Sequence, residues 1–98
     1  MDYQNLLKTY MDKEGRILIY PSKRKLKNVV LFYLSTKFTF NIQYTEKQVN
    51  EIIDTYCLFN DSALIRRELY MNKFLNRHID GSAYWLEEIQ PCAEKFGL

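Results

Sequence analysis

Apolar residues recur with a helical period in the middle of the chain. One stripe at helical spacing consists of Val49, Ile52, Ile53 and Tyr56. Thr45 precedes this stripe and Gln48 lies three residues further on, so each side chain can satisfy a free backbone N–H of the first turn. A shorter stripe with Ile65 and Leu69 follows a new capping position at Asn60 or Asp61. The pattern predicts two helices joined by a tight turn.

The spacing then changes from helical to alternating, over residues 75–79 and again over residues 82–86. Asp80-Gly81 between the two runs predicts a β-hairpin with a type I′ turn, in which both central residues have positive φ. The register that follows pairs Leu75 with Leu86, Arg77 with Tyr84 and Ile79 with Ser82. A helix-turn-helix followed by a hairpin predicts an α+β fold of the winged-helix type. Trp85 then serves either as a packed lid or as an exposed anchor for a partner.

Three further elements are expected in the amino-terminal part. A helix over about residues 3–11, capped by Asp2, presents a narrow apolar face made of Tyr3, Leu6, Leu7, Tyr10 and Met11. This helix is too short to be stable alone, so its face packs either on the body of the protein or on a second copy, as a homodimer contact. Residues 16–20 predict a short strand that Pro21 closes. Ser22 then caps a helix that runs to about Lys37.

The first turn of that last helix is unusually basic, with Lys23, Arg24, Lys25 and Lys27. The amino-terminal end of a helix already carries partial positive charge, so these side chains oppose the helix dipole. A bound phosphate would compensate both the dipole and the side chains, which makes the cluster a candidate phosphate-binding site. The alternative is a solvated basic surface that serves solubility.

Length and composition indicate one domain over residues 1–98, with a core of about residues 16–86 and a tail over residues 87–98. The 98 residues are 47% hydrophobic and 27% charged, as in ordinary globular proteins. No apolar run reaches membrane-spanning length and no signal-peptide pattern appears, so we expect a cytoplasmic protein without a membrane partner. Either Phe96 docks on the domain, or the tail that contains it frays.

Motifs for catalysis, metal binding or cofactor binding are missing from the sequence. His78 is the single histidine, the two cysteines fit neither a metal nor a disulfide motif, and glycine-rich phosphate loops are absent. We therefore expect a non-enzymatic protein without a cofactor or a metal. Charge is unevenly distributed: residues 1–43 hold eight Lys/Arg and three Asp/Glu, a net +5, and residues 44–98 hold six and nine, a net −3.

Separated motifs along the chain resemble the prokaryotic domain-of-unknown-function family 2087. The residues that carry the resemblance are Asp12, Gly15-Arg16-Ile17, Tyr20-Pro21, Lys23-Arg24-Lys25, Val30-Leu31, Tyr33-Leu34, Tyr44-Thr45-Glu46-Lys47, Val49-Asn50, Ile53, Arg66-Arg67-Glu68-Leu69, Gly81-Ser82 and Tyr84-Trp85. Such domains occur alone or appended to ArsR-type transcriptional regulators. The resemblance implies a winged-helix-like domain associated with transcription, and it implies no reaction.

The second helix of a helix-turn-helix enters the major groove of DNA, and a following hairpin contacts the backbone or minor groove. The candidate DNA-binding residues are Arg66, Arg67, Tyr70, Lys73, Arg77 and His78. Residues 44–86 nevertheless hold five Lys/Arg and six Asp/Glu, and this net −1 favours weak binding. The alternative function is a protein-interaction or dimerisation domain that does not bind DNA, with Leu64 and Met71 as partner contacts. Arg66 then serves stability only, by pairing locally with the turn of Glu68 or with an acidic neighbour on the preceding helix, Glu51 or Asp54.

Overall fold

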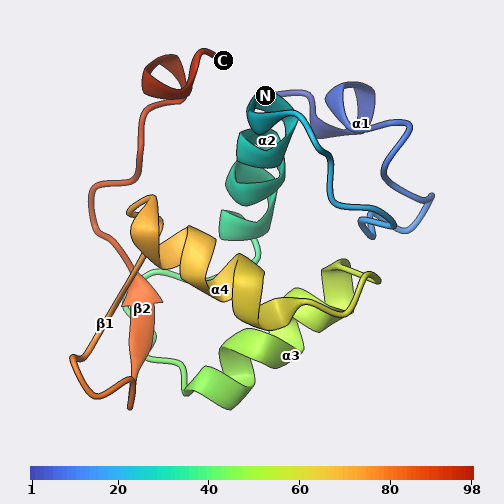
Figure 1. Ribbon diagram of the computed structural model, residues 1–98. Coiled ribbons are helices and arrows are strands. Elements are labelled where there is room, and N and C mark those ends of the chain that lie inside the picture. Colours follow the sequence, from blue (N-terminus) through green and yellow to red (C-terminus); the bar gives the residue numbers. More distant parts are fainter.

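A computed structural model describes all 98 residues and shows a small α+β fold with four α-helices, a two-stranded antiparallel hairpin and a short 3-10 helix (Figure 1). The elements are α1 Tyr3–Leu6, α2 Arg24–Ser35, α3 Glu46–Tyr56, α4 Ser62–Met71, β1 Leu75–Arg77, β2 Tyr84–Leu86 and the 3-10 helix η1 Ala93–Phe96. Helix α4 packs on both α2 and α3, and the hairpin follows its carboxyl-terminal end. None of the helices is long and apolar enough to cross a membrane.

The two central helices begin where the sequence predicts. Thr45 and Gln48 form a complete capping box at the start of α3, with the Gln48 N–H donating to Thr45 Oγ1 at 3.1 Å and the Thr45 N–H donating to Gln48 Oε1 at 2.9 Å. Asp61 rather than Asn60 caps α4, because its carboxylate accepts from the Leu64 N–H at 3.3 Å. The predicted apolar stripes are confirmed: Val49, Ile53, Ile65 and Leu69 are fully buried.

The hairpin has the predicted register but not the predicted turn. Leu75 faces Leu86 and Arg77 faces Tyr84 across the two strands. The type I′ turn is wrong, because only Gly81 has positive φ, at 75°, whereas Asp80 does not. His78 instead closes the loop, its carbonyl accepting from the Gly81 N–H at 2.9 Å. The connecting loop is therefore longer than two residues, although the pairing is unchanged.

A third segment joins the hairpin through Tyr44. Two backbone hydrogen bonds of 2.7 Å connect Tyr44 and Tyr84 as an isolated antiparallel bridge. Tyr44 lies between α2 and α3 in the sequence, so this bridge ties the start of α3 to β2. The hairpin is thereby fixed to the helical body from both sides, through α4 at one end and through Tyr44 at the other.

The amino-terminal part differs from the sequence predictions. Asp2 caps α1 as expected, with 3.2 Å from the Asn5 N–H to Asp2 Oδ1, but the helix ends at Leu6 rather than near Met11. Residues 16–20 form no regular strand, because Ile17 makes only isolated bridges to Met11 and Cys57. Ser22 does not cap α2, which begins one residue later with Lys23 at the N-cap and no side-chain hydrogen bond.

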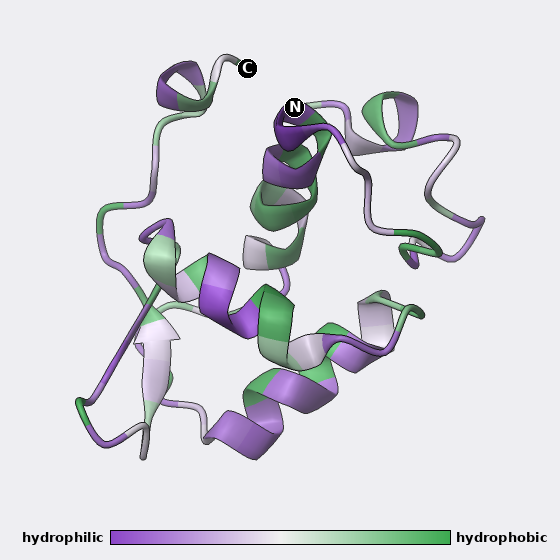
Figure 2. Cartoon of the chain, viewed as in Figure 1, coloured by the Kyte–Doolittle hydropathy of each residue, from purple (hydrophilic) through white to green (hydrophobic).

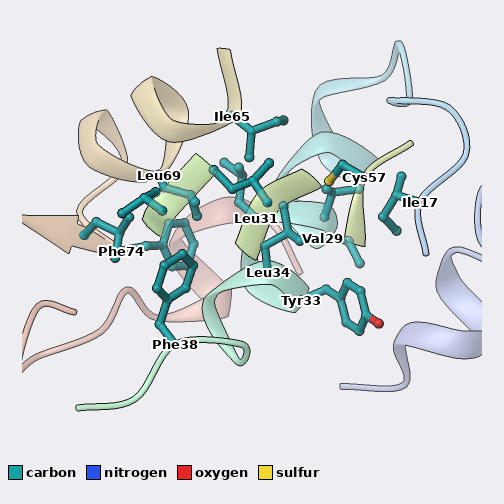
Figure 3. Packing of buried hydrophobic residues seen from close by; sticks show 14 of the residues in the cluster. Ile17, Val29, Leu31, Tyr33, Leu34, Phe38, Cys57, Ile65, Leu69 and Phe74 are labelled. Atoms are coloured by element: carbon teal, nitrogen blue, oxygen red, sulfur yellow. The ribbon is translucent and has the colours of Figure 1, made fainter. Parts of the chain in front are cut away.

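Helix α2 supplies the centre of the hydrophobic core (Figure 3). Its residues Val29, Val30, Leu31 and Leu34 are buried with exposures of 1% or less. Phe74, at the entry to β1, is also fully buried and meets Phe32 edge to face, with ring centroids 4.8 Å apart. The carboxyl-terminal tail docks on this cluster, since Phe96 lies 5.4 Å from Phe32 between ring centroids.

Candidate nucleic-acid interface

A depression of about 180 Å³ lies where α4 meets the hairpin. Arg66, Arg67 and Tyr70 from α4 line it together with Arg77 and Tyr84 from the two strands. Tyr70 lies about one turn after Arg66 and Arg67, so these side chains share one flank of α4, and the confirmed register places Arg77 opposite Tyr84. The structure thus brings four of the predicted DNA-binding residues together and adds Tyr84.

Arg77 is held in this depression by aromatic side chains. Its guanidinium lies 4.9 Å from the centre of the Tyr70 ring, a cation–π contact. Hydrogen bonds to the oxygen atoms of Tyr70 and then Tyr84 raise the pKa of Arg77. Its Nε is buried and has no hydrogen-bond partner. A buried donor without an acceptor is costly.

Arg66 already has partners within the protein. Its Nη2 lies 2.7 Å from Glu46 Oε1, and its Nη1 donates to the Asn50 side chain. The side chain is only 17% exposed, so the pair links α4 to the first turns of α3. The expected pairing of Arg66 with an acidic neighbour therefore occurs with Glu46, and not with Glu51 or Asp54. Arg67 is exposed and makes no ion pair, which leaves it as the free cation on this flank.

The basic cluster at the start of α2 is divided among several roles. Arg24 reaches across to α4, with 3.3 Å between its Nη1 and Glu68 Oε1. Lys27 lies over the Tyr20 ring at 5.4 Å. Lys23 and Lys25 are exposed and unpaired, at the end of α2 that is hydrophilic in Figure 2. The Arg24–Glu68 pair places this cluster on the flank of α4 opposite Arg66, because Glu68 and Arg66 lie on opposite sides of the helix.

Lys73 and His78 do not line the depression. Lys73 is exposed just past α4, where its φ of 70° turns the chain into β1. His78 is exposed on the hairpin loop and packs edge to face against Trp85, with ring centroids 5.1 Å apart. Trp85 itself is half-buried, so it is neither a fully packed lid nor a free anchor.

The residue that sequence reasoning left out of the site is Tyr84. The predicted hairpin register already placed Tyr84 opposite Arg77, and this pairing could have identified Tyr84 as part of the site. No group of three or more His, Cys, Asp or Glu side chains is arranged to hold a metal ion.

Apolar side chains for a partner contact are distributed unequally. Met71 on the outer face of α4 is 66% exposed, whereas Leu64 is only partly exposed. The apolar face of residues 3–11 is used inside the protein: Leu7 and Met11 are buried, and Tyr3 packs on Tyr33 with ring centroids 5.3 Å apart. Packing on the body, rather than on a second copy, therefore accounts for most of this face, while Leu6 is exposed and Tyr10 is half-buried.

Residues 16–86 match the family described as "Uncharacterized protein conserved in bacteria (DUF2087)". The match covers well over half of the chain, which therefore belongs to this bacterial family. No curated protein and no solved structure matches the chain.

Proposed function

We propose that this protein is a non-enzymatic, cytoplasmic winged-helix module of the transcription-regulator type that binds nucleic acid. The order of elements supports the winged-helix assignment: α2, the Tyr44 bridge, α3, α4 and then the β1–β2 hairpin. In this arrangement α4 is the recognition helix and the hairpin is the wing. The resemblance to domains appended to ArsR-type regulators points to the same class.

The observation that carries the proposal is the convergence of Arg67, Tyr70 and Arg77 in one depression. Two guanidinium groups at one point suit a phosphate, because each can donate two hydrogen bonds to it. Arg77 also holds a buried Nε without an acceptor. We infer that the depression takes a backbone phosphate, while the outer face of α4 lies in the groove.

Binding is expected to be weak and strongly dependent on salt. Arg66 and Arg24 are already paired with Glu46 and Glu68, which removes two cations from the footprint. Lys23 and Lys25, on the other flank of α4, are placed to hold a second phosphate. With so few unpaired basic side chains, the protein can make only a few phosphate contacts. These contacts set both the affinity and its dependence on salt.

The experiment is fluorescence anisotropy with a labelled duplex of random sequence at about 50 mM and about 200 mM salt. Arg67→Gln and Arg77→Gln should each weaken binding and lower the slope of log affinity against log salt by about 0.9. Lys13→Gln removes the same charge from an exposed turn away from α4 and is the matched control, so its slope should not change. Arg66→Gln should mainly reduce stability, because it breaks the link to Glu46.

Absence of duplex binding at the lower salt concentration would overturn the proposal. The exposure of Met71 favours the second candidate, a protein-interaction domain that never contacts DNA. In that case Met71→Asp should abolish partner binding, whereas Arg67→Gln should leave it nearly unchanged.

A further inference from the structure

A second and larger concavity, of about 700 Å³, lies on another part of the hairpin. It separates the segment of residues 40–43, which leads into α3, from the end of β2 and the residues that follow it. The side chains that matter here are Phe40, Ile42, Trp85, Leu86, Glu87 and Glu88. We call this concavity the β2 slot. Its volume lies in the range of ordinary ligand-binding clefts.

One wall of the β2 slot is an unpaired strand edge. The Tyr84 N–H and C=O both bond to Tyr44, and the Glu87 N–H bonds to Phe74 of the hairpin at 3.0 Å. Since backbone groups alternate in direction along an antiparallel strand, the Leu86 N–H and C=O point to the same side as those of Tyr84. The next residue in register on that side is Ile42, yet no backbone hydrogen bond joins Ile42 to Leu86.

Asn41, one residue before Ile42, limits how far the segment that leads to Tyr44 can extend along β2. Its φ of 64° is left-handed, a conformation that a β-strand cannot contain and that asparagine tolerates better than most residues. An extended segment beside β2 can therefore begin no earlier than Ile42. Leu86 is 5% exposed and lines the slot, and no backbone hydrogen bond from another segment reaches its N–H or C=O.

The side chains around this edge indicate which kind of ligand the slot can bind. Phe40 is 49% exposed and Ile42 is 45% exposed, so apolar surface faces the slot beside Trp85. Glu87 and Glu88 lie at its rim, and neither forms an ion pair with any lysine or arginine of the chain. The Glu87 carboxylate accepts only from the Asn76 side-chain amide, at 3.3 Å. No Lys or Arg lines the slot, so its field attracts cations and repels phosphate.

We propose that the β2 slot binds an extended peptide segment with alternating apolar and basic residues, which pairs with Leu86 as an added strand. Backbone hydrogen bonds to Leu86 would provide affinity, as in other cases of strand addition to an open sheet edge. Apolar side chains would cover Phe40, Ile42 and Trp85, and basic ones would meet Glu87 and Glu88. This site is separate from the arginine-lined depression, so it does not depend on nucleic-acid binding.

The test uses the full chain and synthetic peptides of alternating valine and lysine, with valine–glutamate peptides of equal length for comparison. Trp85 is the only tryptophan, so its fluorescence reports occupancy of the slot. We expect the lysine peptide to bind about tenfold or more tightly than the glutamate peptide. N-methylation of the peptide amide that pairs with Leu86 should weaken binding about two- to tenfold for each lost hydrogen bond. Hydrogen exchange of the Leu86 amide should slow when the peptide is added.

Glu87→Gln combined with Glu88→Gln should reduce the preference for the lysine peptide, because glutamine keeps the acceptor for Asn76 and loses the charge. Glu94→Gln removes an exposed carboxylate outside the slot and should have no effect. The proposal is overturned if neither peptide changes Trp85 emission, or if the lysine peptide binds without protecting the Leu86 amide. A Leu86 amide already protected in a dimer without peptide would overturn it in favour of a second copy as the occupant. Salt-dependent duplex binding through Arg67 should stay the same in all of these variants.

Discussion

Residues 44–86 and residues 1–23 are built on different principles. In residues 44–86 each helix begins at its own capping side chain, Thr45 for α3 and Asp61 for α4. In residues 1–23 the only helix has a single turn, a local turn at Asp12 follows, and Ile17 is held by distant partners. The Ile17 N–H donates to the Tyr56 carbonyl at 2.6 Å, and the Leu58 N–H donates to the Ile17 carbonyl at 2.8 Å.

The difference shows which part of the fold depends on the rest. A helix of several turns with a side-chain cap carries part of its stabilisation locally, whereas a single turn or an isolated bridge forms only when its partners are already in place. The stability of the amino-terminal part should therefore depend on residues that are remote in the sequence. The stability of residues 44–86 should depend most strongly on their own capping side chains and apolar stripes.

Gly15→Ala is expected to have the largest effect. Gly15 has a φ of 78°, and a Cβ there would lie 2.6 Å from the Tyr33 hydroxyl. That hydroxyl donates to the Gly15 carbonyl at 2.5 Å, so the substitution adds backbone strain and displaces a hydrogen bond. We expect the free energy of unfolding to fall by about 2–4 kcal/mol, measured by urea denaturation.

Tyr33→Phe separates the two contributions. Alone it should cost about 1 kcal/mol through the lost hydrogen bond. Combined with Gly15→Ala it should cost less than the sum of the single effects, because the clash with the hydroxyl is gone. Strict additivity would show that Tyr33 does not hold the turn at Gly15.

Thr45→Ala and Ser22→Ala compare a cap that the structure contains with one that only the sequence suggests. Thr45→Ala should lower the free energy of unfolding by about 0.5–2 kcal/mol, because the capping box of α3 is lost. Ser22→Ala should change it by less than about 0.5 kcal/mol, since Ser22 makes no capping hydrogen bond to α2. Equal losses for the two variants would contradict the start of α2 at Arg24.

The smallest expected effect concerns pH and the turn at Asp12. The Arg16 backbone N–H, and after it the Arg16 guanidinium at 2.7 Å, lower the pKa of Asp12 below its ordinary value. A carboxyl whose pKa is lower in the folded state stabilises the fold above its unfolded pKa. This stabilisation is lost as the pH falls through the folded pKa.

Asp12→Asn should therefore flatten the decline of stability with falling pH in the acidic range, measured by denaturation at a series of pH values. The asparagine still accepts from backbone N–H groups, so the turn itself should remain. A wild-type Asp12 that titrates in NMR at its ordinary value would contradict the pairing with Arg16.

Part of the candidate site was accessible from the sequence. Helical spacing and hairpin register placed Arg67, Tyr70 and Arg77 on adjoining elements, and the structure brings them into one depression. The pairing of Arg66 with Glu46 and Asn50 was not accessible, because it depends on how α3 and α4 cross. The pairing of Arg24 with Glu68 likewise depends on the packing of α2 against α4.

The sequence by itself determined the elements whose signals are local: the capping box at Thr45, the stripes of α3 and α4, and the register of the hairpin. These depend on residues a few positions apart, so their energetics are contained in the segment. Only the tertiary structure decided the early end of α1, the reduction of residues 16–20 to bridges and the open edge at Leu86. Each of these outcomes depends on contacts between distant segments, or on a left-handed residue such as Asn41 whose conformation the packing selects.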